Sequence, residues 1–168
     1  MSLNANLIKE LREKSGAGIV DCKNALMQNE NDIEKSIDWL RKKGLSVAAK
    51  KSGRVAAEGL VGVHINNNQA CLIEINSETD FVSRNEQFQK FVNDCSQIAT
   101  TTDGDLDSLL KSKFIESDNT VEDELTKNIA TIGENLNIRR IEKITLHEPG
   151  SIVSYVHNSV SENLGKIA

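Results

Sequence analysis

The spacing of apolar residues changes once along this chain, close to Ala57, and that change constrains the fold more than any other feature. Before it, apolar residues recur at the three- and four-residue spacing of helices. After it, Val61, Val63 and Ile65 alternate with polar or small residues, as in a strand with one buried face. A helical part followed by a part with strands is typical of an α+β protein.

Three short helices are predicted in the first part of the chain. Their apolar stripes are Leu3, Leu7, Ile8 and Leu11 in the first, Val20, Cys22, Ala25 and Leu26 in the second, and Ile33, Ile37 and Leu40 in the third. We expect Asn31 to cap the third helix and Gly44 to end it. Because so small a bundle has few apolar side chains, Trp39 is expected in its core.

The segment 41–54 is basic and contains alanines, which predicts a fourth helix that connects the helical part to the rest of the chain. The first 56 residues carry 11 Lys and Arg against 7 Asp and Glu, whereas the net charge of the whole chain is -5. Single-strand-binding surfaces interleave such charges with aromatic rings, and this segment has none. We therefore expect a solvated connector, no nucleic-acid partner, and a domain boundary at residue 54.

The second part, 55–168, is expected to form a core in which helices pack on an antiparallel sheet. The asparagines 66–68 supply the turn of a β-hairpin, Thr120 caps a later helix, and further strands are predicted over 138–146 and 152–157. The apolar stripes of two helices are Phe88, Phe91, Val92, Cys95 and Ile98 in one, and Leu125, Ile129, Ile132 and Leu136 in the other. Such stripes suit helices laid on a sheet.

Asp80 and Phe81 lie between a predicted strand, 71–75, and the first of these helices. Ser83, with Glu86 three residues later, forms a capping box that would open the helix. A large ring on such a connection either packs beneath its own loop or contacts another molecule. The residues alone leave both alternatives open.

Residues capable of covalent catalysis form no recognisable set in this sequence. His64, His147 and His157 lie outside any nucleophile or metal signature, and no phosphate-binding glycine loop follows a strand. We therefore expect no enzyme chemistry, no cofactor, no metal and no direct nucleotide binding. The three cysteines lack metal spacing and suit buried thiols in a reducing compartment. No run approaches the ~20 apolar residues of a membrane span, so a soluble intracellular protein is expected.

Several motifs resemble those of the translation elongation factor Ts family, in the order in which that family carries them. The matching stretches are Leu11 to Lys23, Asp32 to Gly44, Gly53 to Gly59, Thr79 to Val82, Gly133 to Arg140, and Tyr155 to His157. Together they cover nearly the whole chain and are more specific than any one of them. The resemblance implies an N-terminal three-helix module of the ubiquitin-associated type, 1–54, followed by the α+β core.

The resemblance also implies a function, guanine nucleotide exchange on the GTPase elongation factor Tu. The implied site residues are Thr79, Asp80, Phe81 and Val82 for exchange, Tyr155 and His157 for a second contact, and Arg12, Ile19 and Val20 for docking of the N-terminal module. Asp80 and Phe81 would insert between two helices of the GTPase and disturb its magnesium and phosphate site. Ile19 and Val20 stand where many members carry methionines, and such β-branched side chains adapt less readily to a partner.

Further expectations concern the organisation of the chain, alternative functions and the compartment. Many family members continue into a second half of the core, whereas here only 141–168 follow the first half, 55–140, so we expect a truncated or short form. An adaptor that binds a partner through the ubiquitin-associated-like module, without affecting nucleotides, is the alternative function, and an RNA-binding protein using 41–54 is a third. The sequence leaves open whether the chain forms a homodimer. The expected compartment is the cytoplasm, or alternatively a mitochondrial or plastid matrix.

Overall fold

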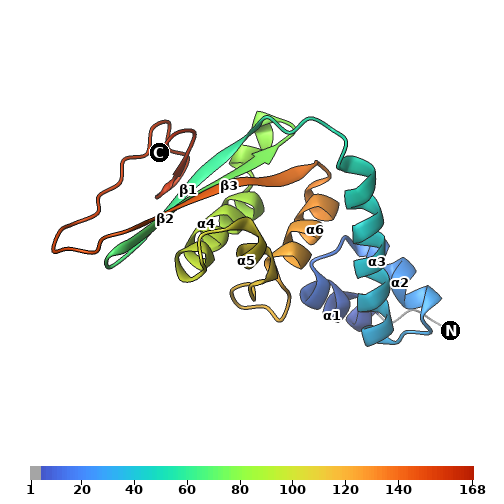
Figure 1. The fold of residues 1–168 in the computed structure, drawn as a ribbon. Helices are drawn as coiled ribbons and strands as arrows, with labels where there is room; N and C mark the ends of the chain where they lie inside the picture. Colours follow the sequence, from blue (N-terminus) through green and yellow to red (C-terminus); the bar gives the residue numbers. More distant parts are fainter. Residues whose placement is uncertain (1–4) are drawn as a thin grey trace. The chain divides into compact units, whose positions relative to one another are not determined.

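The computed structural model of the chain, drawn in Figure 1, describes residues 5–168. The contacts divide it into two units, one made of the chain up to Gly53 together with Thr126–Gly133, the other of Arg54–Leu125 and Glu134–Ala168. Helices at the N-terminus are followed by an antiparallel sheet with packed helices, which confirms the predicted α+β class. Leu3, which the sequence pattern assigned to the first helix, lies outside the described residues.

The first unit begins with α1 (Ala5–Ser15), α2 (Ile19–Gln28) and α3 (Ile33–Lys51). Its core consists of Leu11, Cys22, Ala25 and Leu26, all fully buried. Trp39 packs against this cluster but is only partly buried, so its predicted place in the core is confirmed in part. Lys43 Nζ lies over the Trp39 ring, 5.4 Å from its centre, which is within the range of a cation–π interaction.

The predicted limits of the third helix were wrong at both ends. Asp32 is the N-cap and accepts a hydrogen bond from the Lys35 N–H at 3.0 Å, whereas Asn31 precedes the cap with a φ of 65°. Gly44 does not end α3, which continues to Lys51, so the separate fourth helix is also wrong. A Cβ at Gly44 would meet Thr126 Cγ2 at 3.7 Å, so the glycine lies where another helix packs closely against α3.

Four antiparallel strands form the sheet of the second unit in the order β3-β2-β1-β4. They are β1 (Glu58–Asn66), β2 (Gln69–Ser77), β3 (Leu136–Thr145) and β4 (Leu164–Gly165). Asn66 pairs with Gln69, which confirms the predicted hairpin and leaves a two-residue turn. Asn67 takes a φ of 53° in that turn, a conformation that asparagine tolerates better than most residues.

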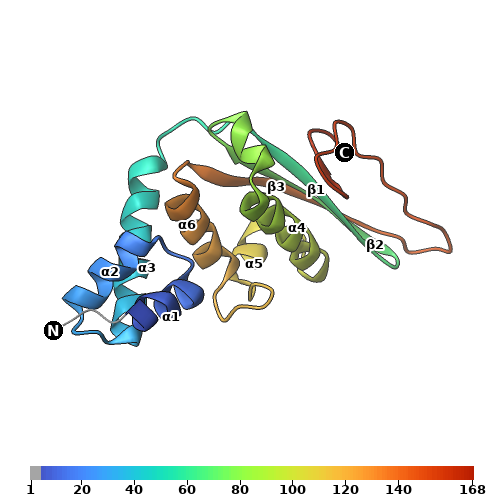
Figure 2. The ribbon, with the colours of Figure 1, turned by 180° about the vertical axis from the view of Figure 1, so that it is seen from behind.

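The helix α4 (Glu86–Thr101) lies along one face of the sheet, as Figures 1 and 2 show from opposite sides. Its predicted stripe is confirmed, because Phe88, Phe91, Val92, Cys95 and Ile98 are all buried. Gly62 on β1 permits the close approach of α4 to the sheet, since a Cβ at Gly62 would come within 2.9 Å of Val92 Cγ1. A short helix, α5 (Leu106–Lys111), follows.

Thr120 caps the helix α6 (Val121–Ile132), as predicted. The Asp123 N–H donates to Thr120 Oγ1 at 3.2 Å, and the Thr120 N–H donates back to the Asp123 carboxylate at 3.3 Å. This reciprocal pair satisfies two N–H groups at the start of the helix. Leu136, the expected last member of the helical stripe, instead begins β3, because the helix ends before Gly133, which has a φ of 85°.

The predicted strand over 152–157 was wrong. In the described structure this segment belongs to a long loop between β3 and β4, drawn in dark red in Figure 1. Of residues 152–157 only His157 makes a β-bridge, to Ile167. A strand needs an edge to pair with, and β4 occupies the edge of β1 at Val61 and Gly62. The apolar alternation of 152–157 was therefore not sufficient to make it a strand.

Candidate functional site

The residues after β2 form a short 3-10 helix, η1 (Asp80–Arg84), rather than an open loop. The Asn85 N–H closes this turn on the Val82 carbonyl at 2.9 Å, and the Asn85 side chain accepts from the Phe88 N–H at 3.1 Å. Asn85 is therefore the N-cap of α4. The predicted capping box of Ser83 and Glu86 was wrong, since Ser83 is buried and its hydroxyl donates to the Gly59 carbonyl at 3.2 Å.

The turn presents Phe81 to solvent and keeps Val82 inside. Phe81 is 75 % exposed, whereas Val82 is only 5 % exposed, and Asp80 lies on the outer side with Phe81. Of the two alternatives that the sequence left open, packing of the Phe81 ring beneath its own loop is thus ruled out. An exposed phenylalanine on an ordered turn loses little conformational freedom when another surface covers it.

The start of the turn is held by a carboxylate from a distant part of the sequence. Glu134 accepts two hydrogen bonds from Thr79, one from the backbone N–H at 3.0 Å and one from the hydroxyl at 2.6 Å. In return, the Asn135 N–H donates to Glu78 Oε1 at 2.6 Å. The Asn135 side chain also donates to the Arg54 carbonyl at 2.8 Å, so three segments of the core meet immediately before Asp80.

Tyr155 and His157, the candidates for a second contact, are brought together by the structure. Tyr155 Oη lies 3.1 Å from His157 Nδ1, and the ring centres are 6.2 Å apart. Tyr155 is 74 % exposed, and both residues lie in the loop before β4. Hydrogen bonds hold the His157 backbone to the chain end, with its N–H donating to the Ile167 carbonyl at 2.8 Å.

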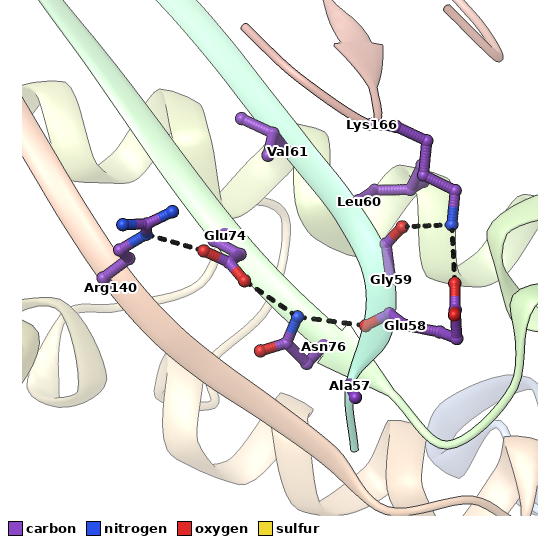
Figure 3. Close-up of a pocket in the computed structure, with 9 residues that line it drawn as sticks. All are labelled: Ala57, Glu58, Gly59, Leu60, Val61, Glu74, Asn76, Arg140 and Lys166. Atoms are coloured by element: carbon purple, nitrogen blue, oxygen red, sulfur yellow. Dashed lines mark hydrogen bonds and ion pairs between the residues drawn. The ribbon is translucent and has the colours of Figure 1, made fainter. Parts of the chain in front are cut away.

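A shallow pocket lies beside β1 and contains a chain of paired charges, which Figure 3 shows. Arg140 Nε donates to Glu74 Oε2 at 2.6 Å, and Asn76 Nδ2 donates to the other oxygen of Glu74 at 3.0 Å. Burial would raise the pKa of Glu74, but the hydrogen bonds from Asn76 and Arg140 outweigh it and hold that pKa below its ordinary value. Lys166 pairs with Glu58 at 3.2 Å, so the four charged side chains of the pocket neutralise one another.

In the first unit, Ile19 and Val20 begin α2 immediately after Gly18 and are 56 % and 68 % exposed. Arg12 lies exposed on α1. Two further exposed apolar side chains, Met27 on α2 and Leu45 on α3, were missed at the sequence level. Their spacing places them on helices, but spacing alone does not tell which apolar residue is left outside a small core.

Sequence reasoning also missed Glu134, Asn135 and Lys166 as residues that shape the turn, and it gave Ser83 a different role there. The motif 133–135 pointed to Glu134 and Asn135, but the bonds to Thr79 and Glu78 join positions 55 and 57 residues apart. No local pattern indicates such pairs. Within residues 5–168, no group of three His, Cys, Asp or Glu side chains is placed to bind a metal, and none of the helices is long and apolar enough to span a membrane.

Comparison with known proteins gives the class of this chain. The family model described as "Elongation factor TS" matches residues 78–168, which include the turn, the carboxylate that holds it and the Tyr155–His157 pair. Elongation factor Ts of Methylobacterium radiotolerans is 54 % identical over 166 residues, which are 99 % of this chain and 54 % of that protein. The protein of the same name from Parvibaculum lavamentivorans is 50 % identical over 165 residues, 98 % of this chain and 53 % of its own length.

The chain belongs to the elongation factor Ts family. A third relative, elongation factor Ts of Azorhizobium caulinodans, is 52 % identical over 99 % of this chain. The chain spans about half the length of the curated relatives that it matches.

Proposed function

We propose that this chain binds the GTPase elongation factor Tu and promotes the release of GDP from it. The observation that carries the proposal is the turn itself: Phe81 stands 75 % exposed on η1, beside Asp80, on a base that Glu134 holds through Thr79. Family membership supports elongation factor Tu as the partner. On this proposal, Asp80 and Phe81 insert between two helices of the GTPase and disturb its magnesium and phosphate site.

The mechanism is negative coupling between two ligands of one GTPase. A protein that binds the nucleotide-free GTPase more tightly than the nucleotide-bound GTPase lowers the affinity of the GTPase for nucleotide. Nucleotide lowers the affinity of the GTPase for that protein by the same ratio. A thousandfold effect requires about 4 kcal/mol of differential binding. Truncation of an aromatic hot spot costs ~2 to 4 kcal/mol, so Phe81 supplies a large share but needs further contacts.

Those further contacts are assigned to two other surfaces. Tyr155 and His157 form the second contact of the core, since the pair is preassembled and Tyr155 is exposed. Arg12, Ile19 and Val20 form the docking surface of the N-terminal module, 1–54, and all three are exposed. Thr79 and Val82 act from within, Thr79 through Glu134 and Val82 by filling the space beneath the turn.

The proposed role involves no covalent chemistry, because the chain acts by binding one state of its partner. It is consistent with a place in protein synthesis in the cytoplasm, since the relatives are named elongation factors and come from bacteria.

An adaptor function is the second candidate, and the exposed Ile19, Val20 and Met27 favour it. Such an adaptor would hold a partner through the N-terminal module and leave the nucleotide in place. Substitutions at Asp80 and Phe81 would then have no effect on binding.

The proposal is tested by nucleotide release. Elongation factor Tu is loaded with fluorescent GDP, excess unlabelled GDP is added, and the rate of fluorescence loss is followed with and without stoichiometric amounts of this chain. We expect acceleration by the chain, with most of it lost in Phe81→Ala and Asp80→Ala.

Ile144→Ala is the matched control, because Ile144 is also an exposed apolar residue of the core but pairs with Ala70 near the hairpin end of the sheet. It should release nucleotide like the unmodified chain. Binding without release would support the adaptor. The absence of both binding and release would refute the proposal for this chain.

A further inference from the structure

One residue near the end of the chain touches both candidate contact elements of the core. The Lys166 backbone N–H donates to the His157 carbonyl at 3.2 Å. Its side-chain Nζ lies 3.3 Å from Ser83 Oγ, and Ser83 is two residues after Phe81 in η1. The backbone of Lys166 thus holds the segment of Tyr155 and His157, while its side chain reaches the turn of Asp80 and Phe81.

The Lys166 ammonium group has as many partners as it has donors. Besides Ser83 Oγ, Nζ contacts the Gly59 carbonyl at 3.0 Å and Glu58 Oε2 at 3.2 Å, as seen in part in Figure 3. An ammonium group donates three hydrogen bonds, so these three acceptors can satisfy it fully. Ser83 directs its own hydrogen to Gly59, which leaves its oxygen lone pairs for Lys166. The four groups form one closed set of hydrogen bonds.

The segment that Lys166 holds has little else to fix it. Most of the loop between β3 and β4 is exposed, and Tyr155 itself is 74 % exposed. Its later part is attached to β1 by two residues of β4 and by the Val63 N–H, which donates to the Asn163 carbonyl at 3.0 Å, while His157 bridges to Ile167. A surface element with so few attachments loses conformational entropy on binding unless something orders it beforehand.

We propose that Lys166 is a positioning residue that joins the Asp80–Phe81 turn and the Tyr155–His157 pair into one preorganised surface for a protein partner. The inference rests on the proposed function for the identity of that partner, but the coupling itself is a property of the free chain. Removal of the Lys166 ammonium group should loosen both elements together. The effect should be reciprocal, so that removal of the Ser83 hydroxyl loosens the segment of His157.

Hydrogen–deuterium exchange of the free chain, with labelling from milliseconds to minutes, tests the coupling. In Lys166→Met, we expect the amides of 80–85 and of 155–159 to exchange about fivefold faster or more, because a group of charge-assisted hydrogen bonds is lost. Peptides from α4 serve as the internal reference and should be unchanged. Lys166→Arg, which keeps the charge and the donors, should restore protection in both segments.

Arg140→Met is the matched control, since Arg140 is a cation of the same pocket whose hydrogen-bond partner is Glu74. It should leave both segments as they are. Equal acceleration in Arg140→Met, or unchanged exchange of 80–85 in Lys166→Met, would overturn the proposal. If Lys166→Met fails to fold, Ser83→Ala is used for the same measurement. Unchanged exchange of 155–159 in Ser83→Ala would also overturn the proposal.

Nucleotide release separates this inference from the proposed function. With elongation factor Tu and fluorescent GDP, the effects of Phe81→Ala and His157→Ala should be non-additive in the unmodified chain and additive in the Lys166→Met background. Non-additivity that persists in that background argues against Lys166 as the connection. If no form of the chain releases nucleotide, the proposed function fails, while the exchange measurements on the free chain still decide the role of Lys166.

Discussion

Glu134 and Thr79 are 55 positions apart in the sequence, yet the Glu134 carboxylate accepts both the backbone N–H and the hydroxyl of Thr79. This carboxylate thus uses both oxygens on the residue that immediately precedes Asp80. Both oxygens of a carboxylate accept, and its negative charge strengthens each hydrogen bond, whereas an amide offers only one accepting oxygen and carries no charge. The Glu134 side chain therefore helps to orient the exposed turn.

Glu134→Gln should weaken this arrangement although it preserves the volume of the side chain. The amide can still accept from the backbone N–H and donate to the hydroxyl of Thr79, but neither hydrogen bond is then strengthened by a charge, so we expect a loss of ~1 to 2 kcal/mol in the free energy of unfolding. Urea unfolding followed by circular dichroism measures it. Glu122→Gln removes the same charge from an exposed position of α6 and should change stability by less than about 0.5 kcal/mol. Equal effects of the two substitutions would show that charge alone, not the contact with Thr79, is responsible.

Phe81 and Val82 are adjacent residues with opposite roles, which a pair of alanine substitutions separates. Phe81→Ala should leave stability within about 0.5 kcal/mol of the unmodified chain, because the ring is exposed, but weaken binding to elongation factor Tu by roughly 30-fold or more. Val82→Ala should instead cost ~1 to 3 kcal/mol of folding free energy, since it empties a buried site.

Urea unfolding and titration calorimetry with nucleotide-free elongation factor Tu distinguish the two losses. A large loss of stability in Phe81→Ala would mean that the ring packs on its own chain in solution. Unchanged affinity in the same variant would remove Phe81 from the binding surface.

The features that sequence reasoning recovered are those with a local physical cause. The stripe of α4 and the hairpin at Asn67 follow from residue spacing and turn chemistry within a few positions. Thr120 was recognisable as a cap for the same reason, because its partner, Asp123, is three residues away. The exposed position of Phe81 was only one of two local possibilities, and the contacts beneath the turn decided between them.

The features that were missed depend on partners far away in the chain. Gly44 looks like a helix end in isolation, but its small size suits close packing against Thr126 and Ala130. The apolar alternation of 152–157 suits a strand, but the edge of β1 pairs with β4. Ser83 could have capped α4, yet burial of its hydroxyl against Gly59 left that role to Asn85. Local preference is overruled at each of these sites by a tertiary contact.

Gly59 should be intolerant of any side chain. Its φ of 131° is rare for L-residues, and a Cβ there would overlap the Ile75 carbonyl oxygen of the neighbouring strand. Gly59→Ala should therefore cost roughly 3 kcal/mol or more in the free energy of unfolding, measured in urea. Since the Gly59 carbonyl accepts from both Ser83 and Lys166, the turn should loosen as well.

Gly53→Ala is the control for this substitution, because nothing lies within 4 Å of a Cβ at that position and its φ is not positive. Its effect should be near zero. A cost for Gly59→Ala no greater than that of Gly53→Ala would mean that β1 shifts to make room, and that the tight pairing of Gly59 with Asn76 is not required.

The three cysteines should report on unfolding, because all are free and buried. Burial raises the pKa of the Cys71 thiol to about 11 and that of Cys95 well above its ordinary value of 9.0. The native thiols should therefore stay protonated and unreactive toward an aromatic disulfide reagent at pH 8, and three should react once the chain is unfolded in urea. Rapid labelling of the native chain would contradict their burial.

The same shift predicts how stability depends on pH. Between pH 9 and pH 11 an unfolded Cys71 loses its proton while the folded one keeps it, so the folded state binds more protons and stability falls as pH rises. For a shift of this size the loss is roughly 2 kcal/mol by pH 11. Cys71→Ala removes the thiol from both the folded and the unfolded state. The stability of this variant should therefore fall less steeply than that of the unmodified chain between pH 9 and pH 11. Parallel curves would show that Cys71 ionises alike in both states.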